Sequence, residues 1–216
     1  MNKLMNVDEV APQEFFIFVN QFNWQTQHNF RLTGKFFSAG FTSLELPGFL
    51  QKFLEGKVRY LPYEPCAMEL MAVSPYFLTA INDYRIEYDI EVFREKHCRL
   101  FPSRLSALYA FGSEADCVEV NRRYGWPLDS VRRFKLIDHP LNRVVRVNME
   151  HVSLARHVYR ASEFSDGDYL WRAYWSGRGN VSIKLPVLGA ADETCHSGVI
   201  WEYLIEGVVE HQKSES

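Results

Sequence analysis

FPSRLSALYAFGS, the stretch Phe101–Ser113, and IWEYLIEGVV, the stretch Ile200–Val209, decide the fold of this chain of 216 residues. In the first, Pro102 ends a helix, because proline disfavours helical geometry in the residue before it and has no N–H of its own. Leu105–Phe111 follows as a largely apolar strand, which predicts burial on both faces. The second stretch is typical of a closing strand and carries acidic residues within an apolar run.

The segment before the proline, Tyr84–Leu100, has the periodicity of an amphipathic helix. Its apolar residues, Ile86 and Ile90 among them, recur on one face at spacings of three and four. The helix, the proline and the strand together place Ser103 and Arg104 at the entrance of a rigid strand. These two polar side chains are therefore expected at a cleft.

The rest of the chain divides into strands and helices on local signals. Predicted strands are Phe15–Phe22, Val131–Ile137 and Arg143–Val147, and Phe30–Leu46 is predicted as a hairpin or as extended segments broken at Gly34 and Gly40. Predicted helices are Phe49–Leu54, Cys66–Val73, Tyr76–Asn82, Ser113–Tyr124 and Ser153–Ser162, with Asp168–Trp175 either helical or extended. Strands that cluster without regular strand–helix alternation indicate the α+β class.

Composition limits the classes of protein to which the chain can belong. Its 47% hydrophobic and 15% aromatic content suits one globular domain over residues 1–216. The net charge of −3 argues against coating nucleic acid by bulk electrostatics, although a local basic groove stays possible on such a body. No uncharged apolar run reaches the roughly 18 residues of a membrane span, so a cytoplasmic protein is expected.

Several common sites find no support in the sequence. The four cysteines, Cys66, Cys98, Cys117 and Cys195, show no CxxC pairing, so neither a zinc site nor a disulfide framework is indicated. No GxGxxG, GxxxxGK[ST], HExxH or GxSxG motif occurs. If the chain uses NAD⁺, it must hold it outside a dinucleotide-binding Rossmann unit.

The order of FPSR, SALYAF, YWSG (Tyr174–Gly177) and WEYLIEG resembles a poorly characterised bacterial family of the ADP-ribosyltransferase superfamily. The resemblance covers roughly residues 84–210, and residues 1–83 are expected to add N-terminal strands and helices to the same domain. It implies two small sheets, antiparallel or mixed, with flanking helices and a cleft for NAD⁺. Family members usually carry a histidine in their first strand, which FFIFVN, Phe15–Asn20, lacks; Asn20, Gln21 or His28 could substitute.

The resemblance also assigns roles to individual side chains. Glu202 would stabilise the positive charge that develops on the nicotinamide ribose, and Glu206, four residues along the strand on the same face, is the second choice. Arg104 would hold phosphate oxygens of NAD⁺ through paired hydrogen bonds. The remaining assignments are Ser103 and Ser106 at the ribose or as braces of the strand, and Tyr109 and Trp175 as stacking surfaces.

Each of these roles has a structural alternative. Arg104 could be a surface arginine paired with Glu95, and the two glutamates could lie on the solvent face of an amphipathic strand. Asn121–Lys135, NRRYGWPLDSVRRFK, combines basic and aromatic residues and so suits phosphate contact and base stacking, or a solvated helix end beside an edge strand. Its candidate acceptor contacts are Arg122, Arg123, Arg132 and Arg133.

Three functions follow from the resemblance. The first is a mono-ADP-ribosyltransferase that modifies a macromolecule, RNA, DNA or protein, in the manner of a bacterial toxin or phage-defence effector with an inhibitory partner. The second is an NAD⁺ glycohydrolase, which uses water as acceptor. The third is a non-catalytic nucleotide-binding or interaction protein on the same fold. None of the three requires a metal.

Overall fold

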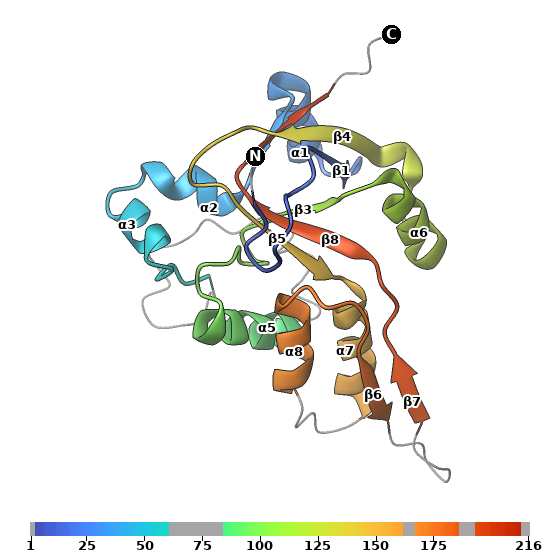
Figure 1. Ribbon diagram of the computed structural model, residues 1–216. Coiled ribbons are helices and arrows are strands. Elements are labelled where there is room, and N and C mark those ends of the chain that lie inside the picture. Colours follow the sequence, from blue (N-terminus) through green and yellow to red (C-terminus); the bar gives the residue numbers. More distant parts are fainter. Residues whose placement is uncertain (1–2, 61–83, 162–166, 186–192, 213–216) are drawn as a thin grey trace.

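The computed structural model describes residues 3–60, 84–161, 167–185 and 193–212, and its class is α+β (Figure 1). A seven-stranded sheet has the order β2-β9-β4-β1-β3-β8-β5, with antiparallel pairing between all neighbours. Its strands are β1 Glu14–Phe18, β2 Lys35–Phe37, β3 Leu108–Phe111, β4 Val131–Leu136, β5 Arg143–Asn148, β8 Trp201–Glu206 and β9 Val208–His211. A separate antiparallel pair, β6 Ser182–Leu185 and β7 Glu193–His196, extends away from it.

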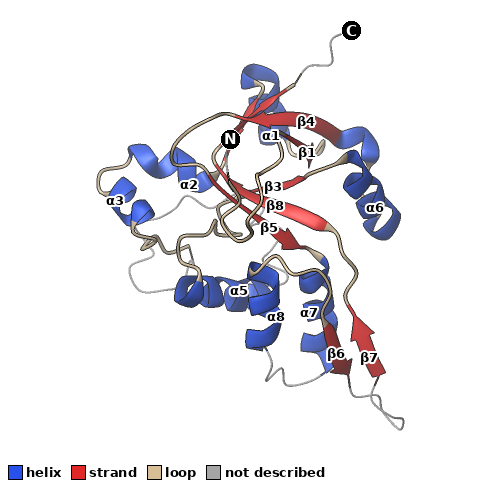
Figure 2. Cartoon of the chain, in the orientation of Figure 1, coloured by secondary structure: helices blue, strands red, loops and turns tan. Residues whose placement is uncertain are grey.

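The helices surround this sheet (Figure 2). They are α1 Trp24–Thr33, α2 Ala39–Thr42, α3 Phe49–Leu54, α5 Tyr84–His97, α6 Glu114–Tyr124, α7 Glu150–Ala161 and α8 Gly167–Trp175, with 3₁₀ turns at Ser43–Glu45 and Leu128–Ser130. None of the helices in the described ranges is both long and apolar enough to cross a membrane.

The closing strand predicted over Ile200–Val209 is divided at Gly207 into β8 and β9. These two strands are separated in the sheet by β3, β1 and β4, a distance of about 19 Å if the sheet were flat. A single linking residue spans at most about 7 Å. The sheet therefore curls on itself. The resemblance implied two small sheets, whereas the structure has one large curled sheet and the separate pair β6–β7.

Gly207 is suited to this corner because its surroundings leave no room for a side chain. A Cβ atom there would lie 2.7 Å from Oδ1 of Asn142 and 3.1 Å from a methyl carbon of Leu136. The backbone N–H of Gly207 donates to the hydroxyl of Ser38. The corner is thus fixed by close packing as well as by strand pairing.

The two sides of the sheet bury different clusters. Helices α5, α7 and α8 lie together against the β5–β8 end, where Ile90, Trp171 and Leu204 share one apolar cluster (Figure 1). Phe15 and Phe134 belong to a second cluster on the other side. Burial on both sides explains why the central strands read as nearly continuous apolar runs.

Local signals predicted several helices correctly. The hydroxyl of Ser113 caps α6 by accepting from the N–H of Asp116, and Gly125 ends it at φ 71°. The helix predicted over Tyr84–Leu100 is present as α5 and ends at His97, and α8 is a helix rather than an extended segment. Helix α7 begins at Glu150, three residues before the predicted start at Ser153.

The N-terminal third departs from the prediction. Phe30–Leu46 is not a hairpin but contains the end of α1, the short strand β2 and α2. Helix α1 escaped notice because few of its residues are apolar, although Asn23 caps it and Gly34 ends it at φ 65°. Strand β1 ends at Phe18, so the last residues of the predicted strand form a loop. The helices predicted over Cys66–Val73 and Tyr76–Asn82 lie outside the described residues.

Candidate functional site

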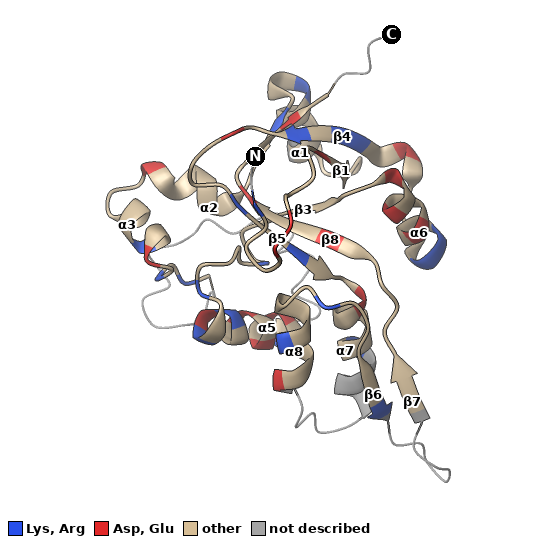
Figure 3. Cartoon of the chain, viewed as in Figure 1, with Lys and Arg blue, Asp and Glu red and all other residues tan. Residues whose placement is uncertain are grey.

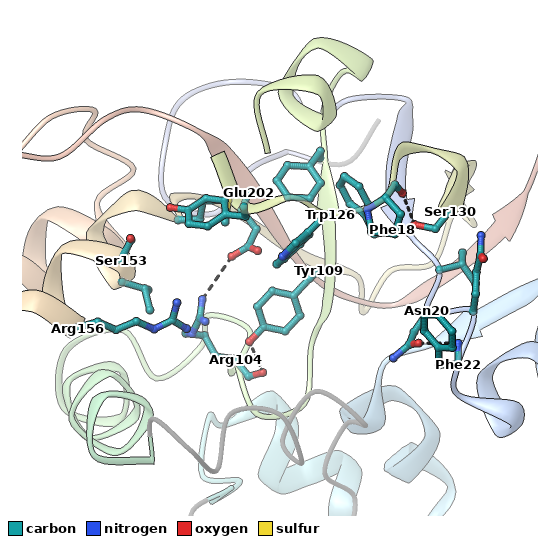
Figure 4. A pocket seen from close by; sticks show the side chains of 17 residues that line it. Phe18, Asn20, Phe22, Arg104, Tyr109, Trp126, Ser130, Ser153, Arg156 and Glu202 are labelled. Carbon is teal, nitrogen blue, oxygen red and sulfur yellow. Dashed lines mark hydrogen bonds and ion pairs between the residues drawn. The ribbon is translucent and has the colours of Figure 1, made fainter. Parts of the chain in front are cut away.

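A pocket of about 650 Å³ lies between the sheet, the end of α6 and the start of α7 (Figure 4). Its volume is within the ordinary range for small-molecule and cofactor sites. The lining includes Phe18–Phe22 after β1, Arg104, Tyr109 and Phe111 around β3, Tyr124, Trp126, Pro127 and Ser130 after α6, Met149, Val152, Ser153 and Arg156 around α7, and Glu202 of β8. Charged groups therefore share one pocket with several aromatic rings.

Arg104 reaches this pocket from a turn and not from a strand. The backbone oxygen of Ser103 accepts from the N–H groups of Ser106 and Ala107, and the hydroxyl of Ser103 accepts from the N–H of Leu105. Strand β3 consequently begins at Leu108, later than predicted. Within the turn, neighbouring side chains point in different directions.

The guanidinium of Arg104 is buried at the meeting point of three elements. Its Nε and Nη2 donate to both carboxylate oxygens of Glu87 on α5, at 2.8 and 3.0 Å. Its Nη1 donates to the hydroxyl of Tyr174 on α8 at 2.5 Å and to Oε2 of Glu202 at 3.4 Å (Figure 4). Arg104 is therefore not a surface arginine paired with Glu95, and two of its three nitrogen atoms are engaged by Glu87.

Glu202 is the acidic residue at the pocket wall. In β8 it lies between Phe111 of β3 and Val147 of β5, and only 4% of the residue is exposed. The pKa of Glu202 is raised to about 7: burial is the main cause, the positive charge of Arg104 opposes the shift, and the nearby carboxylate of Glu87 adds to it. Near neutral pH the carboxyl group can therefore exchange between its neutral and charged forms.

Glu206 does not share this pocket. Its Oε1 accepts from the hydroxyls of Ser106 at 2.6 Å and Tyr60 at 3.2 Å, in a separate small cavity that Arg143 also lines. Burial raises the pKa of Glu206 as well. The two glutamates point to one side of the strand, but they have different partners in the turn: Arg104 contacts Glu202 and Ser106 contacts Glu206.

Ser103 and Ser106, both predicted to contact the ligand, instead bond glutamates in the protein interior. Ser106 donates to Glu206, and the hydroxyl of Ser103 donates to Glu91 at 2.9 Å. Both serines are completely buried and neither lines the pocket. These bonds hold the turn that leads into β3, in keeping with the alternative that the two serines brace the strand.

Of the two residues predicted as stacking surfaces, only Tyr109 lines the pocket. Tyr109 lines the pocket, and its hydroxyl donates to the backbone oxygen of Arg104. Trp175 is 1% exposed in the apolar core, with its indole N–H directed at the backbone oxygen of Ile90. The tryptophan at the pocket is Trp126, which the sequence placed in an aromatic and basic segment but did not single out.

The loop after β1 supplies the residues proposed in place of the missing histidine. Asn20 and Gln21 line the pocket, whereas His28 lies on α1 and does not. Arg156, which sequence reasoning missed, also lines the pocket, from α7. Nothing local in the sequence distinguishes it, because its position depends on how α7 packs beside the sheet.

The four arginines expected to contact an acceptor all interact with oxygens of their own chain. Arg122 bonds Glu119, Arg123 bonds Glu150, Arg132 bonds the backbone oxygen of Asp129, and Arg133 bonds Glu14. None of these four lines the pocket. These contacts fit the solvated helix end of the predicted alternative, but β4 lies between β9 and β1 and is therefore not the edge strand that this alternative assumed.

Within the described ranges, no group of three or more His, Cys, Asp or Glu side chains is placed to hold a metal ion. Cys98, Cys117 and Cys195 are free thiols. The sequence matches no model of a known protein family, and no curated protein matches it. The function is therefore argued from the chemistry of the pocket.

Proposed function

We propose that this chain is an ADP-ribosyltransferase-like enzyme that cleaves NAD⁺ and transfers ADP-ribose to a macromolecule. The observation that carries the proposal is the buried carboxyl group of Glu202, which faces an aromatic pocket of about 650 Å³ beside Arg104. The resemblance assigned Glu202 to the nicotinamide ribose and Arg104 to the phosphates of NAD⁺. The α+β class and the antiparallel sheet are compatible with such a fold, although one large curled sheet takes the place of two small ones.

Glu202 has the properties that this chemistry needs. Loss of nicotinamide breaks the bond between the anomeric carbon and the ring nitrogen, and the electron pair leaves with nicotinamide. The positive charge that develops on the ribose is stabilised by a fixed carboxylate more strongly than the ground state is. A nucleophile of the acceptor then bonds to the anomeric carbon and loses its proton. Since only the ionised Glu202 can act in this way, cleavage should rise with pH through about 7.

The rest of the pocket supports the same ligand class. Tyr109 and Trp126 offer flat faces for the rings of a dinucleotide. Arg156 adds a guanidinium suited to phosphate oxygens. Arg104 is held by Glu87, so we assign it mainly to orienting Glu202 and its surroundings, a narrower role than phosphate capture.

The test is incubation of the purified chain with adenylate-labelled NAD⁺ and, separately, single-stranded RNA, DNA and protein, with measurement of released nicotinamide and labelled polymer. Glu202→Gln should reduce nicotinamide release by about 100-fold or more, as expected when a main electrostatic stabiliser is lost. Glu206→Gln, in the other cavity, decides which of the two carboxylates acts.

Glu210→Gln is the matched control, because Glu210 is a half-exposed glutamate of β9 that lines neither cavity. Release of nicotinamide without labelled polymer would identify a glycohydrolase. Absence of release with every acceptor, from protein whose fold is intact by circular dichroism, would contradict the enzyme proposal and leave a binding protein.

A further inference from the structure

One exposed aromatic side chain lines the pocket, and a second lies two residues further along the chain. Phe22 lines the pocket and is nevertheless 92% exposed, and Trp24, two residues further on at the start of α1, is 82% exposed. Figure 4 shows Asn20 and Phe22 across the pocket from Arg156. Exposed rings beside a catalytic pocket are costly to solvate, so a ligand that covers them would gain binding free energy.

Hydrogen bonds order the backbone of the loop that carries the two rings. The side-chain oxygen of Asn20 accepts from the backbone N–H of Phe22 at 2.9 Å, and the amide of Gln27 donates to the backbone oxygen of Asn20 at 3.1 Å. The side-chain oxygen of Asn23 caps α1 through the N–H of Thr26. Because the backbone of this loop is already ordered, a ligand that binds there does not have to order it.

The charge of this segment is distinctive. The sequence has no Asp or Glu between Glu14 and Glu45, while Arg31 and Lys35 lie within that interval. Residues 20–29 are rich in amide side chains, including Asn20 and Gln21 at the pocket. The segment itself therefore adds no acidic group that would repel a phosphate, as the colouring of α1 in Figure 3 also shows, and amides both donate to and accept from base edges.

We propose that residues 20–29 bind an unpaired nucleic-acid strand, with a base stacked on Phe22 and Trp24 so that the strand enters the pocket toward Glu202. The proposal rests on the proposed function, because it identifies the strand as the acceptor of ADP-ribose. Stacking on exposed rings requires bases that are not paired in a duplex. The platform also differs from the basic segment Asn121–Lys135, four of whose arginines already contact oxygens of this chain.

The decisive measurement is strand binding without NAD⁺, so that its outcome is independent of catalysis. Fluorescence anisotropy would follow labelled RNA and DNA single strands of about 12 nucleotides, within the range of single-strand binding sites, and the matching duplex. Phe22→Ala and Trp24→Ala should each raise the Kd for the single strand about fivefold or more, the lower end of what base stacking contributes.

The matched control is Leu32→Ala, since Leu32 is a 70% exposed apolar residue of the same helix. Its Kd should stay within about twofold of wild type. The proposal is overturned if wild type binds neither RNA nor DNA strand, if it prefers the duplex, or if Leu32→Ala weakens binding as much as Trp24→Ala.

A separate titration with NAD⁺ excludes the other source of a flat base, the adenine of the dinucleotide. Trp24→Ala should leave the Kd for NAD⁺ within about twofold of wild type. If Phe22→Ala and Trp24→Ala weaken NAD⁺ binding but leave strand binding unchanged, the platform holds adenine and the proposal is wrong.

Discussion

Glu202→Gln should stabilise the protein near neutral pH although it removes the central group of the pocket. The pKa of Glu202 is about 7 in the folded chain and 4.5 in the ordinary, solvated state, because burial disfavours the charge. The folded protein therefore binds the proton more tightly than the unfolded chain does. This difference corresponds to about 3 kcal/mol.

The sign of the pH dependence follows from proton binding. Between pH 4.5 and about 7 the unfolded state has released the proton of Glu202 while the folded state retains it, so ionisation favours unfolding. The wild-type free energy of unfolding should consequently fall over this interval, relative to the variant, and level off above it. Glutamine has nearly the same shape and can still accept from Arg104, so packing is largely preserved.

Urea unfolding of both proteins at about pH 5 and at about pH 8 measures this difference. The advantage of Glu202→Gln over wild type should grow by up to about 3 kcal/mol between the two conditions. Glu210→Gln, whose side chain is 49% exposed in wild type, controls for the loss of one negative charge. An advantage that does not change with pH, or that declines as pH rises, would refute the assignment of a desolvated carboxyl group.

Two further predictions concern the packing that positions the pocket. Glu87→Ala leaves the buried guanidinium of Arg104 without its paired acceptor. It should lower the free energy of unfolding, measured by urea titration, by about 3–5 kcal/mol. A loss below about 1 kcal/mol would show that the pair is dispensable. Gly207→Ala should lower the free energy of unfolding by about 1–3 kcal/mol, because the added carbon overpacks against Asn142. Gly179→Ala should lower it less, because the nearest atom there is 3.6 Å from the added carbon. Equal losses in the two variants would contradict the close packing at Gly207.

The parts of the fold that could be predicted from sequence are those whose stabilising contacts are local. Helix α6 has its cap at Ser113 and its left-handed glycine at Gly125, both within a dozen residues. Helix α1 carries little apolar periodicity, and its one clear apolar anchor, Phe30, packs on Phe36 and on distant Phe134. Such a helix is stabilised by contacts that no local pattern records.

The same distinction applies to the site. Arg104 and Glu202 could be selected from sequence because a motif and an acidic residue in an apolar strand identify them. Their partners could not: Glu87 lies 17 residues from Arg104 and Tyr174 lies 70 residues away. Trp126 and Trp175 look equivalent as sequence, and only the packing of α8 into the core separates them.

The two buried glutamates of β8 show how one strand can serve structure and chemistry. Glu206 accepts from the hydroxyls of Ser106 and Tyr60, so its burial is compensated by two hydrogen bonds. Among the described residues, Glu202 accepts one hydrogen bond, a long one of 3.4 Å from Arg104. A buried carboxyl group with so little compensation destabilises the folded chain.

Because Glu202 lines the pocket, a ligand can supply what the protein does not. A hydroxyl that donates to Glu202 would favour its ionised form and offset part of its desolvation. The ribose of NAD⁺ presents such hydroxyls beside the bond to be broken. Under the proposed function, the same lack of hydrogen-bond partners that makes Glu202 costly in the free protein would favour binding of a ribose hydroxyl. We therefore expect Glu202→Gln to remove both the pH dependence of stability and the release of nicotinamide.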